Sequence, residues 1–350
     1  MTKKFVDCFM IMGTALSLRN PIKLPEMGRP VLRDVITTSV NLSLSVETLK
    51  IINPENLEVE LTALLNQEWT DARLGANVKT RKMAVAGQIW KPKIISINGE
   101  NKICNNEDAV FWRGFGDEGN VLLSEKISVR TTCTTNYRKF PFDTQICDFK
   151  FGTYRFPQDE VTVVWDSVPL HITTNINFNE FNVTNIITFI ETDVRCSGNF
   201  STAVVQFVFK RHYQHYIYCL MLPPFLLTLL NYTPFWFNLN KRTNRLCINT
   251  SVLFLLVYFN YCSICSMRPT PYLKALDIFV LICTSFSLTT LLETIFVDFV
   301  CTLEESHFHL KKVACSKEYP KNILWLEYAM KLSYPVFCIF FLIVYGWLYF

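Results

Sequence analysis

The sequence predicts an all-β domain followed by a bundle of four membrane-spanning helices, and two observations lead to this fold class. Of the 350 residues, 50% are hydrophobic and 18% are charged, whereas about a quarter of an ordinary soluble domain is charged. The long uncharged runs lie almost entirely after residue 211, and residues 20–210 have the mixed composition of a soluble domain. The net charge of only +4 gives no basis for a disordered or nucleic-acid-coating protein.

The chain begins with a segment that has the shape of a secretory leader. Lys3 and Lys4 precede an apolar run, Phe5–Leu16, and small residues lie near the expected cleavage point. We therefore predict a signal peptide over residues 1–18. Because Asp7 interrupts the short apolar run, an incomplete or misassigned start is the alternative.

Residues 19–211 are predicted to form an immunoglobulin-like β-sandwich. Short runs such as Leu57–Ala63 and Val204–Phe209 alternate between apolar and polar residues, and Asn, Gly, Pro and Asp separate them. Alternation of this kind indicates strands buried on one face, and many such runs indicate a sandwich, for which we expect about ten strands. A short N-terminal helix is expected near residues 20–36.

Residues 212–350 contain four apolar stretches that predict membrane spans: Tyr216–Phe237 and Leu246–Met267 carry no charged residue, Ile278–Leu292 is followed by Glu293 and Asp298, and Ser333–Phe350 closes the chain. The first of them would extend about 33 Å as a helix, at about 1.5 Å per residue. The predicted spans cover residues 216–237, 246–267, 277–300 and 326–350.

Basic residues predict the orientation of these spans. Lys241, Arg242 and Arg245 lie between the first two spans, and a short loop, residues 302–322, adds further lysines. By the positive-inside tendency both connections are cytoplasmic. The outer domain and the C-terminus are therefore extracellular in a multi-pass protein of the plasma membrane. Three glycosylation sequons agree with an extracellular outer domain. They begin at Asn41, Asn182 and Asn199.

Four of the 13 cysteines fall in the outer domain, where an oxidising compartment lets cysteines pair. Two of them, Cys133 and Cys147, enclose a segment that contains Phe140-Pro-Phe-Asp143. This segment resembles the signature loop of the Cys-loop pentameric ligand-gated ion channels, the neurotransmitter-gated ion channel family. The resemblance implies a disulfide between these two cysteines. Whether Cys104 pairs with Cys196 stays open.

Ordered motifs along nearly the whole chain carry the same resemblance. Trp69–Leu74 and Trp90–Pro92 look like two core motifs of the family's sandwich, and Pro223 stands in the first span as expected. Tyr272–Asp277 is similar to the start of the third span. The chain is thus identified as a divergent member, and the family architecture implies a ring-shaped pentamer with four further subunits.

The resemblance also implies a set of residues that couple the two domains. In the family, the disulfide loop meets the connection between the first two strands, the residue before the first span and the loop before the third span. These roles are carried over to Asp143, Glu55, Arg211, Pro269 and Tyr272.

In the family, a small-molecule agonist binds between neighbouring subunits, and it is commonly an amine held by aromatic faces. Tyr154 and Phe200 stand at two of these positions, but Ile97 and Leu64 occupy two others. Cys196 stands alone where nicotinic principal subunits carry adjacent cysteines. An apolar pocket of this kind favours an amphiphilic ligand over acetylcholine.

The second span carries residues three or four positions apart, which places them on one helical face that aligns with the family's pore lining. Belts of Phe254 and Tyr258 at mid-depth would stop ions by dewetting. Packing of this stripe against lipid or other spans is the alternative. The predicted pore-lining residues are Asn244, Arg245, Cys247, Ser251, Phe254, Tyr258, Tyr261 and Cys265.

These patterns predict a ligand-gated channel subunit that contacts lipid and permeant inorganic ions but no nucleic acid. Anion conduction is favoured, because Asn244 stands where cation channels of the family usually carry Glu. The alternatives are a cation-conducting or non-selective channel and a non-conducting accessory subunit. We expect no cofactor, no metal and no enzymatic activity. The chain has only 5 histidines, so we interpret His212 and His215 as residues at the membrane interface rather than as metal ligands.

Overall fold

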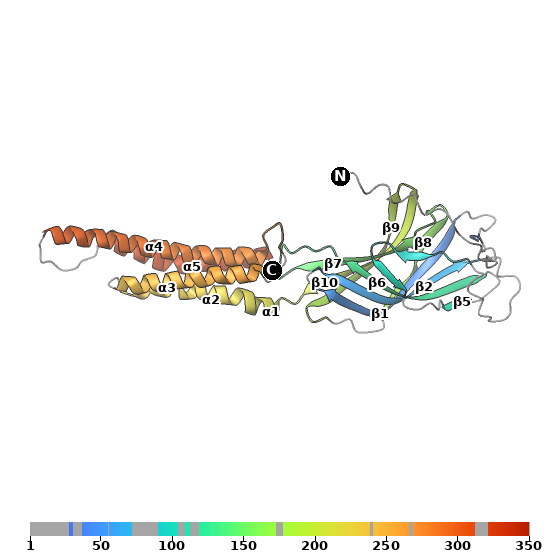
Figure 1. The fold of residues 1–350 in the computed structure, drawn as a ribbon, viewed down its shortest axis with the longest axis horizontal. Helices are drawn as coiled ribbons and strands as arrows, with labels where there is room; N and C mark the ends of the chain where they lie inside the picture. Colours follow the sequence, from blue (N-terminus) through green and yellow to red (C-terminus); the bar gives the residue numbers. More distant parts are fainter. Residues whose placement is uncertain are drawn as a thin grey trace, which may run out of the picture.

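The computed structural model describes residues 28–30, 37–54, 56–71, 90–103, 109–112, 119–172, 178–238, 241–265, 269–311 and 321–349. The predicted signal peptide, Glu55 and Cys104 lie outside these residues, and so does nearly all of the expected helix near residues 20–36. Figure 1 shows an elongated molecule with a strand-rich domain at one end and a helical bundle at the other.

The first sheet of the outer domain has six strands in the order β4-β6-β2-β1-β8, with β5 also paired to β6. Among the described strand pairs, β1–β8 alone is parallel. The strands are β1 Thr38–Asn53, β2 Glu58–Thr70, β4 Glu100–Ile103, β5 Ala109–Trp112, β6 Asn120–Thr132 and β8 Val161–Ile172.

The second sheet has four strands in the order β3-β7-β10-β9. Its strands are β3 Ile94–Ser96, β7 Thr144–Thr153, β9 Phe181–Arg195 and β10 Gly198–Arg211. The ten strands confirm the predicted β-sandwich.

The core of the sandwich lies between the two sheets, because alternate residues of each strand point inward. Every second residue of β2 is buried, as in Leu61 and Leu65. Phe149 of β7 and Phe207 of β10 are buried from the other sheet, with ring centroids 5.7 Å apart. Such aromatic burial contributes a large share of the hydrophobic stabilisation of a core.

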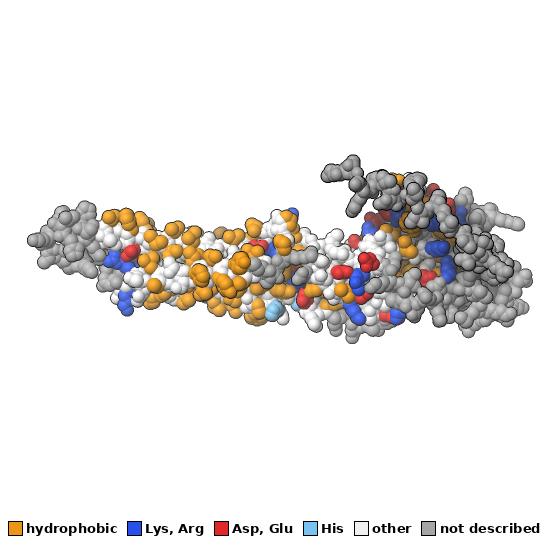
Figure 2. Space-filling model, in the orientation of Figure 1, with side chains coloured by type: hydrophobic (Ala, Val, Ile, Leu, Met, Phe, Trp, Pro, Cys, Tyr) orange, Lys and Arg blue, Asp and Glu red, His pale blue; other side chains and the backbone are white. Residues whose placement is uncertain are grey.

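The helical half contains four apolar stretches long enough to cross a membrane. They are Gln214–Trp236, Arg242–Ile264, Ala275–Leu303 and Ile323–Tyr349. The helices α3 Arg242–Cys265, α4 Ala275–Lys311 and α5 Lys321–Tyr349 carry the last three. Hydrophobic side chains cover the visible face of this half, and charged side chains gather near its ends and on the outer domain (Figure 2).

The first apolar stretch is not a regular helix. It consists of the short helix α1 Gln214–Tyr216, the π-helical turn η2 Ile217–Met221, the helix α2 Leu222–Leu230 and the 3-10 turn η3 Thr233–Trp236. The π-helical turn ends at Met221, and after Leu222 come Pro223 and Pro224, which cannot donate backbone hydrogen bonds to the preceding turn. The missing donors explain the local widening of the helix.

Two helices extend beyond the predicted spans. The second helix begins at Arg242 rather than near residue 246, and α4 continues to Lys311, so that half of the predicted loop 302–322 is helical. Hydropathy marks the part of a helix that lies in lipid, and a helix that extends into water on polar residues gives no such signal.

Candidate functional site

The disulfide loop lies at the junction of the two domains. Cys133 and Cys147 form the expected disulfide, and Phe140 of the loop is buried against Ala275 and Leu276 at the start of α4. The backbone N–H of Ala275 donates to the carbonyl oxygen of Arg138 at 2.9 Å, and that of Leu276 donates to the carbonyl oxygen of Phe140 at 3.2 Å. The loop therefore satisfies two of the amide groups that every helix leaves free at its N-terminus.

The same loop also binds the end of β10, directly before the first span. Arg211 Nε donates to Asp143 Oδ1 at 2.7 Å, and Arg211 Nη2 donates to Asp143 Oδ2 at 3.1 Å. Both side chains are buried, with Asp143 only 1% exposed. Gln145 Nε2 also donates to Asp143 Oδ2. This bidentate geometry fixes the orientation as well as the distance of the pair.

Aromatic rings enclose the Arg211 guanidinium, with Phe181 at 4.4 Å and Phe140 at 5.0 Å from its carbon. Arg211 Nη1 also donates to the hydroxyl of Tyr216 in α1, at 3.4 Å. Burial alone would lower the pKa of Arg211, but the hydrogen bonds and negative charge of Asp143, with a contribution from Tyr216, outweigh it and raise the pKa. Arg211 therefore carries a fixed positive charge.

The remaining predicted coupling residues differ in their contacts. The hydroxyl oxygen of Tyr272 accepts a hydrogen bond from the backbone N–H of Tyr137 in the disulfide loop, at 3.0 Å. Pro269 is exposed, and Glu55 lies outside the described residues. Sequence reasoning missed Tyr216, which touches both Arg211 and Phe140. In the sequence, Tyr216 only marks the start of the first predicted span.

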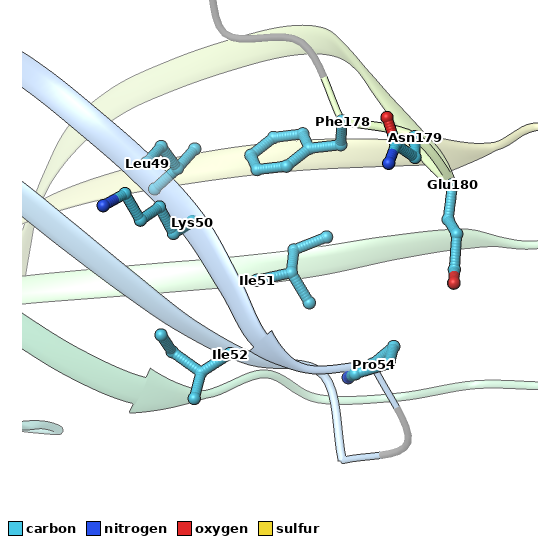
Figure 3. A pocket seen from close by; sticks show the side chains of 8 residues that line it. All are labelled: Leu49, Lys50, Ile51, Ile52, Pro54, Phe178, Asn179 and Glu180. Carbon is cyan, nitrogen blue, oxygen red and sulfur yellow. The ribbon is translucent and has the colours of Figure 1, made fainter.

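Beside the junction, a groove of about 410 Å³ lies between the end of β1 and the residues before β9. Five of its eight lining residues are apolar, Phe178 and Ile51 among them, and Glu180 lies at one end (Figure 3). The backbone oxygen of Glu180 accepts a hydrogen bond from the N–H of His212 at 2.8 Å. The groove thus borders the segment that leads from β10 into the first span.

Three of the four predicted ligand positions come from one end of the four-stranded sheet. Ile97 follows β3, Tyr154 follows β7 and Phe200 lies at the start of β10. Ile97 packs against β7, since its Cδ1 lies 2.8 Å from where a Cβ on Gly152 would stand. Tyr154 is 75% exposed, whereas Phe200 is 3% exposed.

The fourth position, Leu64, lies in β2 of the other sheet, directly opposite Ser45 and Lys126. A single subunit therefore does not bring Leu64 together with the other three. Cys196, next to the hairpin tip, is exposed and has no disulfide in the part of the chain that the structure describes. Its pairing with Cys104 stays a prediction.

The predicted pore face of α3 is exposed on the subunit, with Phe254 71% and Tyr261 66% exposed. Asn244, Cys247, Ser251 and Tyr258 are exposed as well. For Cys265, at the end of α3, the structure describes the backbone only.

Arg245 is a correction to the predicted pore lining. Its side chain is 1% exposed, lies inside the bundle and forms an ion pair with Glu327 of α5. Neighbouring positions on a helix point about 100° apart, so Arg245 and the exposed Asn244 cannot share one face. We therefore remove Arg245 from the pore stripe.

This architecture, a β-sandwich whose disulfide loop binds both the start of the first span and the start of the third, defines a class of membrane receptor. Residues 23–213 match the model of the neurotransmitter-gated ion-channel ligand binding domain. The chain belongs to this family.

Curated relatives match further into the chain. This chain is 23% identical over 287 residues to a glutamate-gated chloride channel of Drosophila melanogaster, and the match covers 80% of this chain and 63% of the relative. It is 26% identical over 284 residues to the serotonin-gated chloride channel mod-1 of Caenorhabditis elegans, covering 77% and 57%. It is 24% identical over 295 residues to the gamma-aminobutyric acid receptor subunit rho-3 of Homo sapiens, covering 80% and 62%.

Proposed function

We propose that this chain is one subunit of a pentameric ligand-gated ion channel of the plasma membrane, with its outer domain and C-terminus extracellular. A small molecule binds between neighbouring outer domains, in a pocket to which one subunit contributes the end of the sheet that carries Tyr154, Phe200 and Ile97 and the next subunit contributes Leu64. Binding favours one arrangement of the outer domains, and the pore helices follow.

One observation carries this proposal. The disulfide loop is bonded to Arg211 on one side and to the N-terminus of α4 on the other. A displacement of the loop therefore moves the starts of two spans together. The disulfide shortens and stiffens the loop, so that little of the displacement is absorbed before it reaches the helices.

Anion conduction is the selectivity that we propose. Two of the relatives are by name chloride channels. In this chain no acidic residue lies between Asn238 and Met267, so the proposed pore has no carboxylate ring along this helix to attract cations. Asn244 is exposed near the start of α3 and is the position where such a ring would stand.

Voltage clamp of cells that express this chain alone tests the proposal. The cells are screened with amines, amino acids and amphiphiles, and the reversal potential is measured in normal and reduced chloride. A ligand-evoked current whose reversal potential follows chloride is the expected result. Asn244→Glu should shift the reversal potential toward that of the cations, whereas Asn238→Glu, outside α3, serves as the matched control.

A second candidate function is that of a non-conducting accessory subunit. It is favoured by the bulk of Phe254 and Tyr258 on the proposed pore face, since five copies of each ring leave little room for water. This candidate predicts surface pentamers without current when the chain is alone, and current when a conducting relative is co-expressed. A cation-conducting or non-selective channel would instead show a reversal potential that ignores chloride.

A further inference from the structure

The hairpin of β9 and β10 carries one of the aromatic residues of the proposed pocket. In this hairpin Arg195 pairs with Gly198, and Asp193 pairs with Phe200. Gly198 has a φ of +127°, which favours glycine and permits the tight turn. The backbone N–H of Gln158 donates to the carbonyl oxygen of Asn199 at 2.7 Å. The hairpin tip is thus held against the loop before β8.

The aromatic face of Phe200 already has a cation. The guanidinium carbon of Arg195 lies 4.4 Å from the centroid of the Phe200 ring, well inside the range of a cation–π interaction. Arg195 Nε also donates to Asp193 Oδ2 at 2.8 Å. Two interactions therefore hold the guanidinium in place, and Phe200 is 3% exposed beneath its neighbours.

This arrangement changes what the pocket can bind. A small amine that sought the ring of Phe200 would have to displace a guanidinium that is also paired with a carboxylate. The side chain of Arg195 remains 24% exposed, and its two terminal nitrogens have no hydrogen-bond partner in the part of the chain that the structure describes. A guanidinium whose Nε is already bonded to a carboxylate still has the N–H groups of its two terminal nitrogens, which can donate to the two oxygens of a second carboxylate.

We propose that Arg195 determines the ligand specificity of this pocket: it occupies the cation position on Phe200, excludes amines from that face, and binds the carboxylate of an apolar acid. The inference rests on the proposed function in one point: the end of the four-stranded sheet that carries Tyr154 and Phe200 is the ligand pocket. Recognition then requires an acidic group and no ammonium group. The apolar remainder of the ligand would contact Ile97, and Leu64 of the neighbouring subunit.

The test uses the full chain in lipid nanodiscs and two probes of one carbon skeleton, 3-phenylpropionate and 3-phenylpropylamine. Binding is measured from the ligand-dependent rise in unfolding temperature. The wild type should bind the acid about tenfold or more tightly than the amine. Arg195→Ala should lose most of the acid binding and gain amine binding. Asp193→Asn should bind the acid more tightly, because it removes the competing carboxylate.

Arg155→Ala is the matched control, because the Arg155 guanidinium also lies over a phenylalanine ring, at 5.9 Å from Phe156. It should leave the binding of both probes unchanged. The proposal is overturned if the wild type prefers the amine, if neither probe binds any variant, or if Arg195→Ala and Arg155→Ala behave alike.

Recording currents from the same variants separates this inference from the proposed function. Ligand-evoked currents whose probe preference is the same in Arg195→Ala and wild type would overturn the inference and leave the channel proposal intact. A reversal of probe binding in Arg195→Ala without any current, alone or with a partner subunit, would support the inference and count against the channel proposal.

Discussion

At the scale of single residues, the Asp143–Arg211 pair shows how a buried charge can serve position rather than stability. Removing two charges from water costs several kcal/mol per ion, which only good geometry and further hydrogen bonds offset. Here Gln145, Tyr216 and the rings of Phe140 and Phe181 supply that compensation. The pair therefore specifies where the end of β10 meets the disulfide loop.

Asp143→Ala should destabilise the chain strongly, because it leaves the Arg211 guanidinium buried without its carboxylate. We expect a loss of about 3–5 kcal/mol in the free energy of unfolding, measured by denaturant unfolding in detergent. Lys126→Ala is the control: it breaks the partly exposed pair with Glu47 and should cost at most about 1 kcal/mol. Equal losses in the two variants would show that burial does not decide the effect.

The same pair should resist alkaline pH. Because the folded-state pKa of Arg211 is raised, the stability that its charge contributes is fully present below the pKa of an arginine in the unfolded chain, which is itself far above neutral. That stability is lost only as the pH rises through the still higher folded value. The difference in stability between the wild type and Asp143→Ala should therefore stay constant from about pH 8 to about pH 10.

At the scale of elements, the periodicity of the sequence predicted those strands and spans that depend only on neighbouring residues. The alternation in β2 and the uncharged run of the first span were sufficient to place a half-buried strand and a membrane span. Contacts between distant segments gave no such signal. Arg245 appeared to belong to the pore stripe, because its partner Glu327 is far away in sequence and only helix packing brings the two together. The family resemblance implied that the disulfide loop meets the loop before the third span, but the hydrogen bonds to the N-terminus of α4 gave no signal in the sequence, since they use backbone groups.

The candidate pocket was predictable only in part for a related reason. The positions of Tyr154 and Phe200 followed from the family resemblance, and Ile97 and Leu64 from counting along the chain. The contact of Arg195 with Phe200 depends on the register of a hairpin, and a shift of one residue would have put Arg195 on the opposite face.

The exposed face of α3 leads to a prediction for the whole helix. If Phe254 forms the narrowest apolar belt of the pore, Phe254→Ala should widen that belt, admit water and produce a ligand-independent leak current. Leu255→Ala is a suitable control, because Leu255 is also exposed but points about 100° away around the helix. Recordings of resting conductance at matched surface expression distinguish the two variants. A leak current in both variants, or in neither, would show that Phe254 does not form the narrowest apolar belt of the pore.

At the scale of the molecule, orientation decides whether the proposed mechanism is possible at all. The ligand pocket must face the outside, and four crossings then return the C-terminus to the same side. The structure agrees with this arrangement in one respect: the C-terminal end of α5 lies near the junction with the outer domain rather than at the far end of the bundle (Figure 1). The sequons of the outer domain give a direct test of the side on which it lies.

Asn41, Asn182 and Asn199 are all exposed on strands of the outer domain, so an extracellular domain should carry glycans that a glycosidase removes. Replacing all three with Gln should abolish the mass shift on treatment. The chain contains its own control, because the sequons at Asn231 and Asn249 lie in the helical half with both side chains buried and should stay unmodified. A glycosidase-sensitive band that survives the triple replacement, or no sensitive band in the wild type, would contradict the proposed orientation and with it an extracellular ligand pocket.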